Sequence, residues 1–257
     1  MRKIIFLFSC FIPSIIWAQT DSILSGIYSW KAPSHEVQKN ILSSTLFEGK
    51  VYDMEWLQMS ANSVKPMNKK IQQQVPANEE HLMIVKSGTI TLGFKDSTWT
   101  IGAGSIALLM PGEKYSLQNT GTGTADFYEM KYRSKLPVNP ARAKDAGGSL
   151  ISNWNNIAFV PNDIGGGRRN FFNRSTAMAK KLEIHVTTLK EGVRSHDPHT
   201  HRAEEIIIVI DKKTEMQIAD KFYKGATGNI YYLGSNLSHA IRNDDTVPCT
   251  YFAIQFE

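Results

Sequence analysis

The stretch His199-Thr200-His201-Arg202-Ala203-Glu204-Glu205 decides what fold and what chemistry we expect of this chain. Two histidines alternate in it, Glu205 follows His201 by four residues, and His239 comes further along the chain. Imidazole nitrogens and a carboxylate oxygen are the ligands that a borderline divalent metal ion takes. The whole chain has only seven histidines, so their concentration here predicts one metal site.

The spacing of these donors fits a β-strand. Successive side chains of a strand point to opposite faces, so His199 and His201 can point into the same barrel. Glu205 is even-spaced from both and begins an apolar stretch, where a buried carboxylate would be costly without a metal ion or hydrogen bonds. We predict that His199, His201, Glu205 and His239 bind one metal ion. The alternative is a set of solvated polar residues on a loop.

The rest of the chain has a β pattern. Short runs rich in Val, Ile, Thr, Phe and Tyr alternate with turn residues, which is typical of a sandwich or barrel. A weak repeat relates residues 104–119 to 228–243, and each copy runs from Gly through two short strands to Asn. We predict two β domains, residues 30–135 and 151–257, joined by a linker over 136–150. The expected strands are 82–85, 89–94, 106–110, 127–132, 182–189, 205–210, 215–219, 229–233 and 250–256.

The N-terminus predicts export. Met1-Arg2-Lys3 precedes an apolar run over residues 4–17, and Ala18-Gln19-Thr20 follows it. This arrangement is typical of a secretory signal peptide, and the run is too short to be a permanent transmembrane helix. We expect residues 1–18 to be a signal peptide cleaved near Ala18, and the mature protein to be periplasmic or secreted. The alternative is a lipoprotein anchored at Cys10.

Composition narrows the partners. Loss of Arg2 and Lys3 lowers the formal net charge from +5 to about +3, which is mild. The sequence has no basic block that would bind nucleic acid, and no later stretch that is long and apolar enough to span a membrane. Cys249 would be the one cysteine left, so no internal disulfide is expected. Its alternation with apolar residues predicts a small buried side chain.

Two motifs resemble those of the cupin superfamily. The first is His-x-His with Glu four residues on, and the second runs from Gly through a turn to His and Asn; here they are His199, His201, Glu205 and Gly228, His239, Asn243. With the repeat, the chain is similar to the two-domain bicupins. The resemblance implies two jelly-roll barrels in tandem and one metal ion bound by the predicted ligands. It also implies a homodimer.

Within bicupins the layout resembles the ureidoglycine aminohydrolases, in which a degenerate first domain precedes a metal-binding second one. That group carries Glu, His, His and Gln as metal ligands, whereas this chain has His, His, Glu and His. In the first copy of the repeat, His81 takes the position of the metal-binding glutamate and Tyr115 that of the last histidine. One possible ligand does not hold a metal, so we expect the first domain to be metal-free.

Three more residues are candidates for catalysis. Glu183 and His185 alternate with apolar neighbours, so their strand has a polar face. If that face looks inward, the two side chains could act as general base and acid near the metal; if it looks outward, they lie on the surface. Arg242 could bind a substrate carboxylate through two hydrogen bonds, or it could be a solvent-facing strand residue.

Three further features have simpler interpretations. His196 could line the cavity, but its turn predicts an exposed loop residue. Glu204 points away from Glu205 and is expected on the surface. The run Gly165-Gly166-Gly167-Arg168-Arg169 lacks the strand–turn–helix context of a phosphate-binding loop, so we expect a flexible loop whose arginines could cap the cavity.

Three functions follow from these patterns. The first is a metal-dependent hydrolase or isomerase that acts on a small polar acid such as a ureido acid, a keto acid or a uronate. Four protein ligands leave open positions only on a five- or six-coordinate ion, which favours Mn, Fe, Ni or Co over Zn. The second is a non-catalytic secreted module that binds a small molecule or carbohydrate. The third is a storage or scaffold protein stabilised by the metal.

Overall fold

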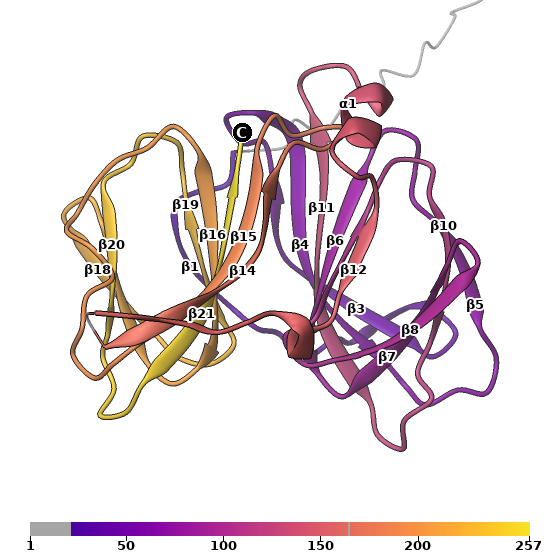
Figure 1. Ribbon diagram of the computed structural model, residues 1–257, viewed down its shortest axis with the longest axis horizontal. Helices are drawn as coiled ribbons and strands as arrows, with labels where there is room; N and C mark the ends of the chain where they lie inside the picture. The colour runs from indigo at the N-terminus through magenta and orange to yellow at the C-terminus, as the bar shows by residue number, and fades with distance from the viewer. Residues whose placement is uncertain (1–21, 164) are drawn as a thin grey trace, which may run out of the picture.

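The computed structural model describes residues 22–163 and 165–257, so the predicted signal peptide over residues 1–18 lies outside the described part. Figure 1 shows two β-rich halves side by side, with their large sheets meeting in the middle and a smaller sheet on each outer side. The strands within these sheets pair antiparallel. The predicted fold class, all-β with two jelly-roll barrels in tandem, is confirmed.

The N-terminal half contains a seven-stranded and a four-stranded sheet. Their strand orders are β12-β9-β6-β11-β4-β3-β2 and β5-β10-β7-β8. Their strands are β2 (His35–Gln38), β3 (Ile41–Gly49), β4 (Met54–Val64), β5 (Ile71–Gln74), β6 (Glu80–Ser87), β7 (Thr89–Phe94), β8 (Ser97–Gly102), β9 (Ile106–Leu109), β10 (Lys114–Gln118), β11 (Ala125–Ser134) and β12 (Leu150–Ser152).

The C-terminal half repeats this plan with a seven-stranded and a three-stranded sheet. Their strand orders are β1-β19-β16-β21-β15-β14-β13 and β18-β17-β20. Their strands are β1 (Gly26–Ser29), β13 (Val160–Asn162), β14 (Gly166–Arg174), β15 (Leu182–Leu189), β16 (Glu204–Asp211), β17 (Thr214–Ile218), β18 (Lys221–Gly225), β19 (Asn229–Leu233), β20 (His239–Asn243) and β21 (Cys249–Phe256).

The two halves exchange an edge strand. β1 (Gly26–Ser29) precedes the first domain in the sequence but pairs with β19 of the C-terminal sheet. β12 (Leu150–Ser152) precedes the second half and pairs with β9 of the N-terminal sheet. Each exchanged strand covers a sheet edge that would otherwise be open for pairing with another chain. Between the halves the chain also forms the short helix α1 (Pro140–Asp145) and the 3-10 turn η1 (Trp154–Asn156).

Strand alternation divides the hydrophobic residues into three clusters. On β16, Ile206 and Ile208 belong to the central cluster between the two large sheets, whereas Ile207 and Val209 belong to the interior of the C-terminal barrel. A strand with both faces covered needs apolar residues at every position, which explains the uninterrupted run after Glu205. The third cluster fills the N-terminal barrel. Cys249 is a free thiol buried inside the C-terminal barrel.

The prediction of a flexible loop over residues 165–169 is wrong from Gly166 onward. Gly166–Arg174 is strand β14, which pairs with β15 along its length. A Cβ at Gly166 would lie 2.1 Å from the Thr188 carbonyl oxygen, so the glycine lets the two backbones approach. Runs of glycine indicate a loop in sequence reasoning, but here they serve close strand pairing. In the described part of the chain, no helix is long and apolar enough to cross a membrane.

Candidate metal centre

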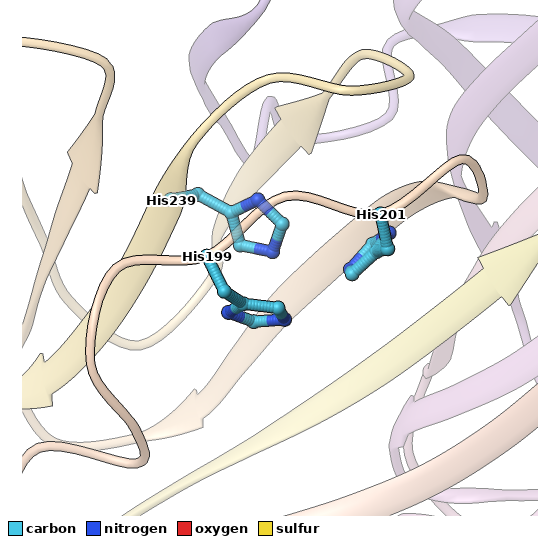
Figure 2. Close-up of side chains that lie close together, drawn as sticks. All are labelled: His199, His201 and His239. Atoms are coloured by element: carbon cyan, nitrogen blue, oxygen red, sulfur yellow. The ribbon is translucent and has the colours of Figure 1, made fainter.

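Three histidines converge at the open end of the C-terminal barrel. His199 and His201 lie on the segment that leads into β16, and His239 is the first residue of β20. The backbones of His199 and His239 pair through two hydrogen bonds, with N–O distances of 3.2 and 3.0 Å. Figure 2 shows the three rings turned toward one another. Each ring offers one nitrogen within 4.8 Å of those of the other two.

Glu205 completes this group from the large sheet. It is the second residue of β16, and its side chain is buried. Its Oε2 lies 3.2 Å from His239 Nε2 and 3.6 Å from His201 Nε2. Gln255 of the neighbouring strand donates a hydrogen bond of 3.3 Å to the other oxygen, Oε1. The structure therefore brings all four predicted metal ligands together.

Hydrogen bonds fix the tautomers of two of the rings. His201 Nδ1 lies 2.8 Å from the Ala203 carbonyl oxygen, and His239 Nδ1 lies 2.8 Å from that of Leu237. A carbonyl oxygen only accepts, so both Nδ1 atoms carry a proton, and a neutral ring then presents its lone pair at Nε2. These two Nε2 atoms are buried and have no hydrogen-bond partner in the described part of the chain. Backbone-oriented histidines with free Nε2 lone pairs are typical metal ligands.

The charges also fit a divalent cation. Burial would raise the pKa of Glu205, but its close contacts with His201 and His239 outweigh burial and hold the pKa far below its ordinary value. The carboxylate therefore stays negative at neutral pH. Burial, and then the charges of the neighbouring imidazoles, lower the pKa of His199. One carboxylate and three imidazoles that converge in this way favour a positive charge among them, and a single metal ion fits this donor set.

A cavity of about 400 Å³ opens beside this group. Glu183 and His185, both on β15, line its wall together with Arg168 of β14, so the polar face of β15 looks inward. Glu183 forms an ion pair with Arg168, and its Oε1 lies 3.3 Å from His185 Nδ1. Burial, and then the charge of Arg168, lower the pKa of His185 to about 4. His185 is therefore a neutral imidazole at pH 7.

Arg242 lies away from the cavity. Its Nε donates to Glu215 over 2.7 Å, and its guanidinium lies 3.4 Å from Asp244. Its neighbour Ile241 lines the cavity, and strand alternation turns Arg242 to the opposite, outer face of β20. Of the two alternatives for Arg242, the structure therefore agrees with the solvent-facing strand residue and not with a residue of the cavity. His196 is exposed but lines the cavity, with its ring centroid 4.1 Å from that of His199.

The surface prediction for Glu204 is wrong. Its side chain is 1 % exposed and accepts hydrogen bonds from the Tyr232 hydroxyl and from the backbone N–H groups of Tyr52 and Asp53. It does point away from Glu205, as predicted, but the other face of β16 packs against the N-terminal half rather than against water. Because a strand pattern gives the face of a residue and not its surroundings, this contact could not be predicted.

Two residues of the site, Tyr251 and Gln255, were missed in the sequence. Tyr251 and Gln255 line the cavity from β21, and Arg168 lines it from β14. Alternation along the predicted strand 250–256 would have placed Tyr251 and Gln255 on one face, although not on the inner one. Arg168, one of the two arginines that could cap the cavity, does line it, but from strand β14 rather than from the predicted loop.

The N-terminal barrel has a different arrangement at the same place in the repeat. His81 lies between two buried carboxylates: its Nε2 is 3.1 Å from Glu79, and its Nδ1 is 3.2 Å from Glu129. The carboxylates contact opposite nitrogens of one ring, so the three groups cannot point at a common ion. Within residues 22–163 and 165–257, the grouping suited to a metal ion is that of the three histidines in the C-terminal half.

Comparison with known proteins identifies the fold. The family described as the cupin domain matches residues 185–255, which include all four predicted metal ligands. No curated protein matches the chain in sequence. Residues 185–255 therefore resemble the cupin domain, and the predicted resemblance is confirmed over that range.

Solved structures agree over both halves. AerE from Microcystis aeruginosa has a TM-score of 0.65 at 17 % identity, covering 90 % of this chain and 99 % of that one. Protein Ylba from E. coli has a TM-score of 0.65 at 15 % identity, with 93 % and 89 % covered. Oxalate decarboxylase from Lactobacillus farciminis, in a formate complex, has a TM-score of 0.66 at 10 % identity, with 92 % and 88 % covered. At these identities the likeness shows the cupin fold alone.

Proposed function

We propose that this protein is a metal-dependent enzyme that acts on a small polar acid by hydrolysis or isomerisation. The observation that carries the proposal is that one cavity joins the metal-ligand group to Glu183 and His185. A metal ion and an acid–base pair facing the same space are the parts that such reactions need. The substrates would be ureido acids, keto acids or uronates. One similar structure is of an oxalate decarboxylase, which supports a carboxylate substrate.

The three histidines and Glu205 would bind the ion, and four protein ligands leave open positions on five- or six-coordinate Mn, Fe, Ni or Co. When bound, the ion supplies Lewis acidity or lowers the pKa of a bound water. Glu183 is held by Arg168 and by a 3.0 Å hydrogen bond from Asn173. It orients His185 through Nδ1, which leaves Nε2 as the ring atom that can exchange a proton with the substrate.

The first experiment combines elemental analysis with turnover of a panel of small carboxylic acids. The wild type is expected to bind about one transition metal ion per chain. His185→Ala should keep that metal and lose at least about 100-fold in turnover, which is the contribution of a general acid or base. Arg242→Ala is the matched control, because Arg242 lies on the outer face of the barrel and should keep activity. Full activity in His185→Ala would contradict the acid–base role.

The second candidate function is a metal-holding binding module without catalysis. The observation that favours it is that Glu183 is already tied by Arg168, Lys181 and Asn173, which would restrain it as a base. Saturable binding of a small acid to the metal-loaded protein, with no product formed from any acid of the panel, would support this function over the first.

We also propose that the protein is exported and acts as a homodimer on small acids outside the cytoplasm. The basis is the N-terminal pattern with Ala18 at its end, which is typical of a cleaved signal peptide. N-terminal sequencing of the protein purified from its native host should begin just after Ala18. Light scattering of the same sample gives the oligomeric state. A chain that retains Met1 in the cytoplasmic fraction would overturn the export proposal.

A further inference from the structure

The N-terminal barrel keeps a cavity at the place where the C-terminal barrel has its metal-ligand group. This cavity measures about 250 Å³ and is lined by polar residues, among them Asn62, His81, Tyr115, Glu129 and Lys131. It is the counterpart of the other cavity, because His81 and Tyr115 occupy the repeat positions of Glu205 and His239. The barrel therefore has an open space without the metal ligands.

Every charged group beside this space already has a partner. The chain of contacts runs from Arg133 to Glu79, His81, Glu129 and Lys131, with N–O distances of 2.7, 3.1, 3.2 and 3.3 Å. Cations and carboxylates alternate along it. A charged ligand would have to break one of these largely buried pairs, which is costly because it leaves the other charge unpaired. The arrangement therefore favours a neutral ligand.

Two of the neutral polar groups in the wall are buried and remain available to such a ligand. Asn62 donates from Nδ2 to Ser60 Oγ over 3.0 Å, and Ser60 Oγ itself donates to the Glu129 carbonyl oxygen. This chain fixes the orientation of the Asn62 amide and leaves its Oδ1 as a free acceptor. The Tyr115 hydroxyl makes no hydrogen bond within residues 22–163 and 165–257. Asn62 and Tyr115 are 4 % and 8 % exposed, so neither is a free surface group.

Apolar side chains provide the remaining surface. Met83, Leu117 and Phe127 line the same cavity and belong to the hydrophobic cluster inside the barrel. A wall that combines an apolar patch with a carbonyl acceptor and a hydroxyl suits molecules with C–H faces and hydroxyl groups. The volume is slightly below the range of about 300–1,000 Å³ for ligand pockets, so the ligand would be small.

We propose that the N-terminal cavity is a metal-independent binding site for a small neutral hydroxyl-rich molecule of monosaccharide or polyol size. A ligand hydroxyl donates to Asn62 Oδ1, and another accepts from the Tyr115 hydroxyl. The C–H face of the ligand packs on Met83 and Phe127. This site is separate from the proposed metal centre, and its occupancy does not depend on the enzymatic function proposed for the other half.

Two methionines allow both cavities to be observed in one sample. Met83 lines the N-terminal cavity, and Met216 lines the cavity of the metal-ligand group. The mature protein is labelled with ¹³C-methyl methionine, and the two signals are assigned with Met83→Leu and Met216→Leu. Glucose, galactose and glycerol are then titrated in the presence of EDTA. We expect a saturable shift of the Met83 methyl signal with at least one of them and no shift of Met216.

Variants connect the signal to the proposed contacts. Tyr115→Phe and Asn62→Ala should each weaken the titration of Met83 about tenfold, as expected for the loss of one hydrogen bond. Tyr251→Phe is the matched control, because it removes a hydroxyl from the other cavity and should leave the Met83 titration unchanged. Unaltered signals from the methionines outside both cavities show that each variant is folded.

Three results would overturn the proposal. The first is the absence of a saturable Met83 shift with all three probes. The second is an equal Met83 shift with sodium acetate, which would indicate an anion site. The third is an unchanged titration in both Tyr115→Phe and Asn62→Ala. None of these results bears on the metal content of the C-terminal half, so the two proposals fail separately.

Discussion

Glu204 and Glu205 are adjacent carboxylates on opposite faces of β16, and replacing each by glutamine separates the contact between the halves from the metal site. Glu204 Oε1 accepts from the Tyr232 hydroxyl and from the Tyr52 N–H, and Oε2 accepts from the Asp53 N–H over 3.3 Å. Glutamine keeps one acceptor oxygen, but its amide nitrogen would face a second donor. One buried donor without an acceptor costs about 1–3 kcal/mol. A loss of about 2 kcal/mol in the free energy of unfolding corresponds to a fall in Tm of roughly 4–8 °C for a chain of this size. We therefore expect Glu204→Gln to lower Tm by this amount and to keep full metal occupancy.

Glu205→Gln, by contrast, should empty the metal site. In the metal-free protein, Glu205 Oε2 lies 3.2 Å from His239 Nε2 and 3.6 Å from His201 Nε2, and these contacts lower the pKa of Glu205. Because a depressed pKa means that the charge of Glu205 stabilises the folded state at pH 7, glutamine should also lower the metal-free Tm. The metal site itself loses its one negative ligand. Because even changes outside the ligand set lower metal affinity by about 10–100-fold, we expect a loss of at least about 100-fold.

Calorimetry with and without EDTA and elemental analysis of the same samples measure both effects. Wild type, Glu204→Gln and Glu205→Gln are compared at pH 7, where Glu205 is ionised because its pKa is depressed. Loss of metal from Glu204→Gln together with an unchanged Tm would refute the assignment of the two faces. Full metal occupancy in Glu205→Gln would refute Glu205 as a ligand.

Three further predictions concern other parts of the fold. Burial would raise the pKa of Glu129, but the hydrogen bond to His81 and the charge of Lys131 lower it to about 2. Because this folded-state pKa is below the unfolded value, the carboxylate's contribution to stability is lost as pH falls from about 4.5 to about 2. In Glu129→Gln the urea midpoint should therefore depend less on pH in that window. Phe252→Ala should cost about 3–5 kcal/mol in urea unfolding, because Phe252 is fully buried in the central cluster; a cost below about 1 kcal/mol would contradict that packing. Gly166→Ala should speed amide hydrogen exchange along β14, because its Cβ would meet a backbone oxygen at 2.1 Å; unchanged exchange would show that the strands tolerate it.

Much of the candidate site could be predicted because its pattern is local. His199, His201 and Glu205 lie within seven residues, and alternation along a strand sends even-spaced side chains to one side. His239 lies far from these residues in the sequence, and it was predicted as a ligand from the repeated Gly–strand–turn–strand pattern. The placement of Glu183 and His185 stayed open, because alternation puts both on one face without saying which face is inside.

Other features depended on which surface each strand packs against. Glu204 is buried because the outer face of its sheet meets the N-terminal half, and no local pattern reports a neighbour that lies 152 residues away in sequence. For the same reason the reciprocal exchange of β1 and β12 could not be foreseen, since each strand pairs with a partner from the other half.

The amino-acid sequence by itself determined the β architecture, the repeat and the four candidate metal ligands, because these follow from the period of a strand and from short motifs. Only the tertiary structure decided that Glu183 and His185 face the cavity, that Arg242 does not, and that His81 is held between two carboxylates. The physical reason is that burial, ion pairing and pKa depend on atoms that meet across sheets and barrels. Residues such as Glu79 and Glu129 are far apart along the chain and meet only in the folded barrel.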